Sequence, residues 1–120
     1  MARSPRAYSG VPMLLPQDIE VLVVESQASV RAQLRTMLTS IGIESPHFAV
    51  SATMAMRRLR AQRFELVLCE YNLGEGQDGQ HLLEDLRQHG IIPLDTLFVM
   101  ITAERNYERV ISACELVPND

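Results

Sequence analysis

The chain contains no lysine and no tryptophan, and only 5% of its 120 residues are aromatic. Its eleven basic residues are therefore all arginines, so no lysine ammonium group is available to any site. The formal net charge is −4 and the pI is near 5.3. This balance gives no electrostatic reason to expect nucleic acid or a membrane surface as a partner.

Cysteines and long apolar runs are also scarce. Cys69 and Cys114 are the two cysteines, and we interpret them as buried structural thiols rather than a disulfide or a metal pair. No apolar run approaches a membrane span, and no apolar segment of a secretory signal follows Arg3 and Arg6. His47, His81 and His89 lack metal-ligand spacing. We therefore expect a cytoplasmic protein without a metal.

What the sequence does contain is a regular alternation of apolar runs and amphipathic segments. Apolar runs predict strands, and apolar residues at helical spacing predict the helices between them. Ser51 and Asp78 are expected N-caps. The strands are expected at 19–24, 45–50, 64–69 and 97–101, and the helices at about 28–41, 52–63, 79–89 and 104–114. The expected inward residues are Val30, Leu34, Leu38 and Ile41, then Ala52, Met56 and Leu59, then Leu82, Leu83 and Leu86.

This order predicts an α/β fold of the flavodoxin-like class, a doubly wound parallel sheet in which strand 19–24 is central. Strands 45–50 and 64–69 should flank it. Residues 1–17 form an N-terminal arm, in which Val11–Leu15 is apolar enough to dock, and residues 18–120 form one domain. The carboxyl ends of the strands should bring together Glu25-Ser26, Glu70 and Thr102.

The segment FELVLCEYNLGEGQDG (64–79), with Glu25-Ser26 and Thr102-Ala103 at their spacing, resembles bacterial response regulator receiver domains of the CheY-like superfamily. The resemblance covers about residues 19–118. It implies that Glu70 stands where the family's aspartate accepts a phosphoryl group. It also implies a Mg²⁺ site at Glu25, Ser26, Glu70 and the carbonyl of Asn72, and a switch at Thr102 and Ala103.

The chain departs from that pattern at several of these positions. Ser26 removes one carboxylate, and each glutamate is longer than aspartate by about a bond length, roughly 1.5 Å. The family's lysine on the fifth strand has no counterpart. We therefore predict no bound Mg²⁺, no other cofactor and no useful phosphorylation of Glu70. The chain would be a non-enzymatic pseudo-receiver of a phosphorelay, acting through protein–protein contacts.

Other interpretations remain open at this point. The alternative function is a working receiver that accepts a phosphoryl group from a histidine kinase. A flavodoxin-like small-ligand binder is disfavoured because no phosphate-cradling loop follows the first strand. Thr102 is either the switch residue or an N-cap, and Glu70 either imitates the phosphorylated state or marks an inactive site. The arginines of helix 52–63 form either a phosphate site or, as we favour, a solvated face.

Receivers of this family have five βα units, and this chain supplies four, so we expect the fifth strand and helix to be missing. Strand 97–101 would then be an unprotected edge beside bare apolar sheet. The sequence therefore predicts a homodimer. The expected partners are a protein, an output domain beyond residue 120, or a histidine kinase.

Overall fold

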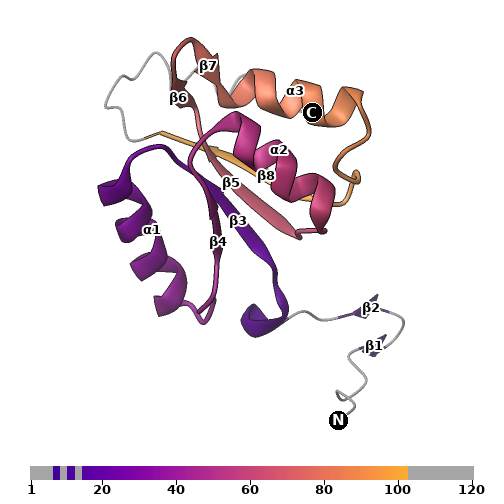
Figure 1. Cartoon of the computed structure of the whole chain (residues 1–120). Helices are drawn as coiled ribbons and strands as arrows, with labels where there is room; N and C mark the ends of the chain where they lie inside the picture. Colours follow the sequence, from indigo (N-terminus) through magenta and orange to yellow (C-terminus); the bar gives the residue numbers. More distant parts are fainter. Residues whose placement is uncertain (1–6, 9–10, 13–14, 103–120) are drawn as a thin grey trace, which may run out of the picture.

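The structure is a computed structural model that describes residues 7–8, 11–12 and 15–102. At its centre, four parallel strands pair in the order β4-β3-β5-β8, with helix α1 on one face and helices α2 and α3 on the other (Figure 1). The strands are β3 Val21–Val24, β4 His47–Ala49, β5 Leu66–Glu70 and β8 Leu97–Ile101. The helices are α1 Ala28–Ser40, α2 Ala52–Ala61 and α3 Gly79–Gln88.

The predicted fold class and strand order are confirmed. β3 lies between β4 and β5, as expected for the first strand of a flavodoxin-like sheet. The predicted helix at 104–114 lies outside the described residues. Within the arm, β1 Ala7–Tyr8 pairs with β2 Val11–Pro12, and the 3₁₀ helix η1 Pro16–Asp18 leads into the sheet.

The sheet separates two apolar clusters because successive side chains of a strand point to opposite faces. Leu22, Val24, Val67 and Cys69 face α2 and α3, which contribute buried Ala55, Leu59, Leu82 and Leu86. Val21 and Val23 face α1 with Leu38 and Ile43. All four residues of β3 are buried, as a central parallel strand requires.

Both predicted N-caps are confirmed. The Ser51 hydroxyl accepts a hydrogen bond from the Met54 amide at 3.1 Å, and Asp78 Oδ1 accepts one from the His81 amide at 2.8 Å. Each bond satisfies an amide that the first turn of a helix leaves without a backbone partner. These caps fix where α2 and α3 begin.

The expectation that Ile41 faces the core is wrong. Its side chain is 61% exposed, and Ile43 is buried instead. The helix ends at Ser40, and Gly42 adopts a left-handed conformation with φ of 97°. The amides of Gly42 and Ile43 then donate to the carbonyls of Thr39 and Leu38, a Schellman motif that turns Ile43 back onto the sheet.

The buried apolar face of α2 is also rotated slightly about the helix axis relative to the predicted one. Ala55 and Leu59 are its buried residues, whereas Ala52 and Met56 are only partly buried. In α3, Leu82 and Leu86 are buried and Leu83 is partly buried, as expected. Ala52 and Met56 are thereby left on a helix flank, beside α3.

A short hairpin after β5 was not predicted. β6 Asn72–Gly74 and β7 Gln77–Asp78 pair in antiparallel fashion around Glu75-Gly76. Both turn residues have positive φ, 52° and 75°, which is the conformation of a type I′ turn. The hairpin leads from the end of β5 to the N-cap of α3 (Figure 1).

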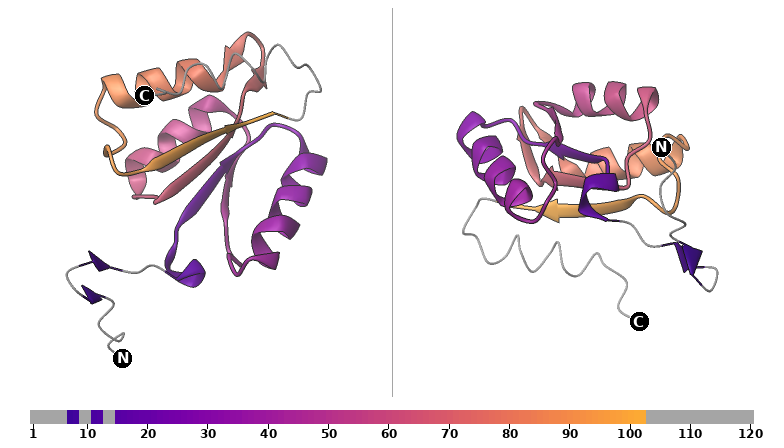
Figure 2. Two further views of the ribbon diagram at one scale, coloured as in Figure 1. Left: turned by 180° about the vertical axis from the view of Figure 1, so that it is seen from behind. Right: turned by 90° about the horizontal axis from the view of Figure 1, so that it is seen from below.

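In the described part of the chain, β8 is an edge of the sheet, since β5 is its one strand neighbour there (Figure 2). Leu97 at its start is 61% exposed, and the remaining residues of β8 are partly buried. The register places Leu97, Val99 and Ile101 on the same face as Leu66 and Leu68, the face that carries α1.

Candidate functional site

The strand register brings the predicted site residues to one level of the sheet. Val24 pairs with Cys69, and Cys69 pairs with Met100, so the next residues on the three strands are Glu25, Glu70 and Ile101. Thr102 follows directly and is partly buried. The register thus places Glu25, Glu70 and Thr102 at the carboxyl ends of adjacent strands, while Ala103 lies outside the described residues.

Glu25 is a buried acid at the end of the central strand, with 2% of its surface exposed. Its Oε2 accepts a hydrogen bond from the Gln27 amide at 2.9 Å, and its backbone carbonyl accepts one from Arg31 Nη1 at 2.8 Å. Among the described residues, Glu25 Oε1 is buried without a hydrogen-bond partner. The loop after β3 thus binds this carboxyl group, and Arg31 of α1 binds the backbone of the same residue.

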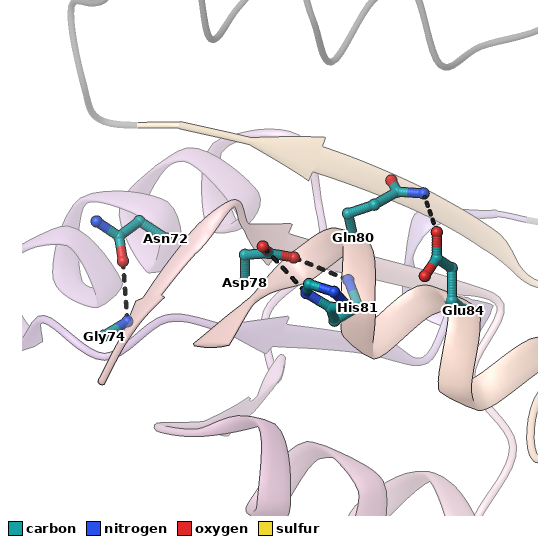
Figure 3. A network of polar contacts seen from close by, with 6 residues as sticks. All are labelled: Asn72, Gly74, Asp78, Gln80, His81 and Glu84. Carbon is teal, nitrogen blue, oxygen red and sulfur yellow. Dashed lines mark hydrogen bonds and ion pairs between the residues drawn. The ribbon is translucent and has the colours of Figure 1, made fainter. Parts of the chain in front are cut away.

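Glu70 is buried as well, with 4% of its surface exposed. Its Oε2 accepts a hydrogen bond from the Asn72 amide at 3.2 Å. The Asn72 side chain instead points into the hairpin, where its Oδ1 accepts from the Gly74 amide at 2.9 Å (Figure 3). One oxygen of each buried glutamate is therefore held by an amide two residues along the chain.

The hairpin and α3 are packed tightly against this pair of strand ends. The Gly79 amide donates to the Tyr71 carbonyl at 2.7 Å. A Cβ on Gly79 would lie 3.0 Å from the Glu70 carbonyl oxygen and 3.1 Å from Cys69 Sγ. Only glycine lets the start of α3 approach β5 so closely. Asp78, beside it, binds both the amide and the ring Nδ1 of His81 (Figure 3).

Burial and like charge set the acid–base properties of the site. Burial, with a further contribution from the neighbouring Glu70 carboxyl group, raises the pKa of Glu25 above its ordinary value. Burial, followed by the charges of Glu70, Glu25 and Asp78, raises the pKa of Cys69 to about 12. The Glu25 carboxyl therefore loses its proton at a higher pH than an exposed glutamate, and the Cys69 thiol is not a nucleophile at neutral pH.

The donor set fits Mg²⁺ poorly. Mg²⁺ requires near-octahedral oxygen coordination, and Glu25 and Glu70 each already give one oxygen to a backbone amide. Ser26, in place of a third carboxylate, is exposed. No group of three or more histidine, cysteine, aspartate or glutamate side chains suited to a metal occurs in the described part of the chain.

Sequence reasoning missed the residues that close the site. The Gln27 amide binds the Glu25 carboxylate, Arg31 binds the Glu25 carbonyl, and Gly79 packs against the Glu70 carbonyl at the start of α3. The Asp78-Gly79 dipeptide predicts a helix start. Apart from the glycine itself, nothing in the sequence indicates that this start packs closely against β5. Arg31 looks like any helix-surface arginine, because its acceptor is a backbone carbonyl.

Comparison with known proteins identifies the family. The family model for the response regulator receiver domain matches residues 21–120. Chemotaxis protein CheY-3 of Vibrio cholerae serotype O1 is 26% identical over 103 residues, which cover 85% of this chain and 77% of that protein.

Solved structures agree with this similarity. The MaeR response regulator bound to beryllium trifluoride is 27% identical, with a TM-score of 0.61 over 85% of this chain and 81% of that one. The signal receiver domain of an HD domain-containing protein from Pseudomonas fluorescens Pf-5 is 26% identical, with a TM-score of 0.63 over 79% and 72%. No helix in the described residues is long and apolar enough to cross a membrane. The chain belongs to the response regulator receiver family of two-component signalling.

Proposed function

We propose that this chain is a pseudo-receiver, which signals through protein–protein contacts and does not accept a phosphoryl group at Glu70. The observation that carries the proposal is the closure of the acidic site. Glu25 and Glu70 are 2% and 4% exposed, and each has an oxygen held by a backbone amide. In-line phosphoryl transfer needs an acceptor oxygen that is open to the donor and supported by positive charge.

The side chains present support the same proposal. Ser26 provides no carboxylate for a metal, and the chain contains no lysine to contact a transferred phosphoryl group. The raised pKa of Glu25 means that burial disfavours its ionised form, which is the form that a divalent cation would bind. The module then has no catalytic activity of its own, and binds a kinase, an output domain or another protein in the cytoplasm.

The test compares three proteins in Mg²⁺ with a small-molecule phosphodonor, read by intact mass. They are the unchanged chain, Glu70→Asp, and the triple variant Glu25→Asp, Ser26→Asp and Glu70→Asp. We expect no phosphoryl adduct on the unchanged chain or on Glu70→Asp. An adduct on the triple variant alone would show that these three side chains prevent phosphorylation of the unchanged chain.

Beryllium trifluoride binding, followed by backbone amide NMR, provides a second readout that does not need a stable covalent product. The relative of known structure named above was solved with this compound bound. An adduct on the unchanged chain, or Mg²⁺-dependent shifts at Glu70 and Thr102, would overturn the proposal in favour of a phosphorylatable receiver.

A further inference from the structure

Helices α2 and α3 lie on the face of the sheet opposite α1 (Figures 1 and 2). Residues of both helices and of the β6–β7 hairpin line a groove. Its volume is about 620 Å³, within the range of small-molecule sites, which is roughly 300–1,000 Å³. Ala52 and Met56 of α2 and Leu82 of α3 supply its apolar surface. This groove is separate from the acidic site, since neither Glu25 nor Glu70 lines it.

The α2 wall carries concentrated positive charge. Arg57 and Arg60 line the groove, and α2 contains no acidic residue. Within the described residues, neither guanidinium makes a hydrogen bond or an ion pair, whereas nearby Arg63 pairs with Asp95 at 2.6 Å. Two cations three positions apart on one helix repel each other, so an anion between them would be stabilising.

The α3 wall carries the opposite charge. Asp85 lines the groove, and its carboxylate makes no ion pair or hydrogen bond with the described residues. Asp78 is already engaged, because it caps α3 and binds His81 Nδ1 at 3.2 Å (Figure 3). The arginine and aspartate charges therefore lie on opposite walls of the groove, with apolar surface between them. They form no ion pair among the described residues, so their nitrogen and oxygen atoms are more than 4.0 Å apart.

We propose that the α2–α3 groove binds a small organic anion that also carries an N–H donor. Its phosphate or carboxylate would contact Arg57 and Arg60, its donor group would contact Asp85, and its apolar body would cover Met56 and Leu82. Arginine forks bind planar or tetrahedral oxyanions through two N–H groups, and a carboxylate accepts from an amino group. The site extends the function beyond protein contacts and does not depend on the state of Glu70.

The experiment uses isothermal titration calorimetry and amide NMR on the full chain with two matched probes. AMP carries a phosphate and an aromatic amine at opposite ends, and 4-aminomethylbenzoate carries a carboxylate and an ammonium group. Adenosine and ribose 5-phosphate each lack one of these ends. We expect one or both of the two-ended probes to bind with shifts confined to α2, α3 and the hairpin, and the one-ended compounds to bind about tenfold more weakly or worse.

Variants of the same helices provide the controls. Arg57→Gln with Arg60→Gln should weaken binding about tenfold or more, and so should Asp85→Asn. Arg58→Gln and Glu84→Gln remove the same charges from α2 and α3 at positions that do not line the groove, and should leave binding unchanged. Binding of AMP alone would identify a phosphate ligand, and binding of the benzoate alone a carboxylate ligand.

Two results would overturn the proposal. The first is no binding of either two-ended probe at millimolar concentration. The second is equal weakening by Arg58→Gln and by the groove variants, which would show that the arginines act only as a diffuse positive charge on a solvated helix face.

Discussion

At the scale of single residues, the buried Glu25 carboxyl has an energetic cost. One of its oxygens has no hydrogen-bond partner among the described residues, and its pKa is raised by burial and by Glu70. In the unfolded chain the carboxyl ionises near the ordinary glutamate pKa of 4.5. Between that value and the higher pKa of the folded state, the folded protein binds more protons than the unfolded chain, so stability falls as pH rises through this window.

Replacing Glu25 with glutamine should therefore stabilise the protein at neutral pH, by about 1 kcal/mol. The glutamine oxygen can accept from the Gln27 amide, and its NH₂ group can donate to the neighbouring Glu70 carboxylate. Urea unfolding at a series of pH values provides the measurement, and the loss of stability above pH 4.5 should be smaller in Glu25→Gln. A parallel pH dependence in both proteins would contradict the assignment to Glu25.

Cys69 provides a second residue-scale prediction. It is fully buried, and burial together with three carboxylates raises its pKa to about 12. It should resist a thiol-specific reagent in the folded state at neutral pH and react fully in denaturant. Peptide mass mapping separates its labelling from that of Cys114. Native labelling of Cys69 at the rate of a free peptide thiol would show that this part of the sheet opens readily.

At the scale of elements, α3 depends on the absence of a side chain at Gly79. A Cβ there would meet Met100 Sδ at 2.5 Å, and the Glu70 carbonyl oxygen at 3.0 Å. The methionine can move, but the carbonyl belongs to the backbone of β5. We expect Gly79→Ala to destabilise the protein by about 1–3 kcal/mol, despite the better helix propensity of alanine.

Gln80→Ala is the matched control for that variant, because Gln80 is the next residue of the same helix and bonds only Glu84 on the helix surface. Its effect on chemical denaturation should stay within about 0.5 kcal/mol. If Gly79→Ala were as stable as Gln80→Ala, the packing of α3 against β5 would be looser than the structure indicates.

The elements also show which parts of the molecule the sequence could predict. Apolar runs and helical spacing placed every described α-helix and every strand of the main sheet but not the 3₁₀ helix η1, and the caps Ser51 and Asp78 marked two helix starts. The β6–β7 hairpin was missed because its turn places a non-glycine residue, Glu75, at positive φ. Ile41 was misassigned because a Schellman turn, rather than the 3.6-residue period, determines which side chain returns to the core.

For the site, the sequence could predict where the two glutamates lie in the fold, but not their burial or their hydrogen bonds. Glu25 and Glu70 were expected together because each follows an apolar parallel strand. Their hydrogen bonds with Gln27, Arg31 and Asn72 each involve a backbone group and so leave no residue-type pattern. The α2–α3 groove likewise could not be predicted from the sequence, since it depends on how the two helices pack beside each other.

At the scale of the whole molecule, the exposed side of β8 favours self-association. In the described part of the chain no strand pairs with its outer edge, and no lysine, proline or charged residue interrupts it. Leu97, Val99 and Ile101 extend the sheet face that carries α1, and Leu97 is the exposed residue among them. Burial of apolar surface contributes roughly 25 cal/mol per Å², so a shared face of a few hundred Å² would contribute several kcal/mol.

We therefore expect a dimer in sedimentation experiments at tens of micromolar, formed along β8 or through the adjoining sheet face. Leu97→Lys places a charge at the exposed start of β8 and should raise the dissociation constant about tenfold or more. Leu94→Lys is the control: Leu94 is 90% exposed but precedes the strand. A monomer in the unchanged chain would refute the prediction, and equal effects of the two variants would show that the contact lies elsewhere than β8.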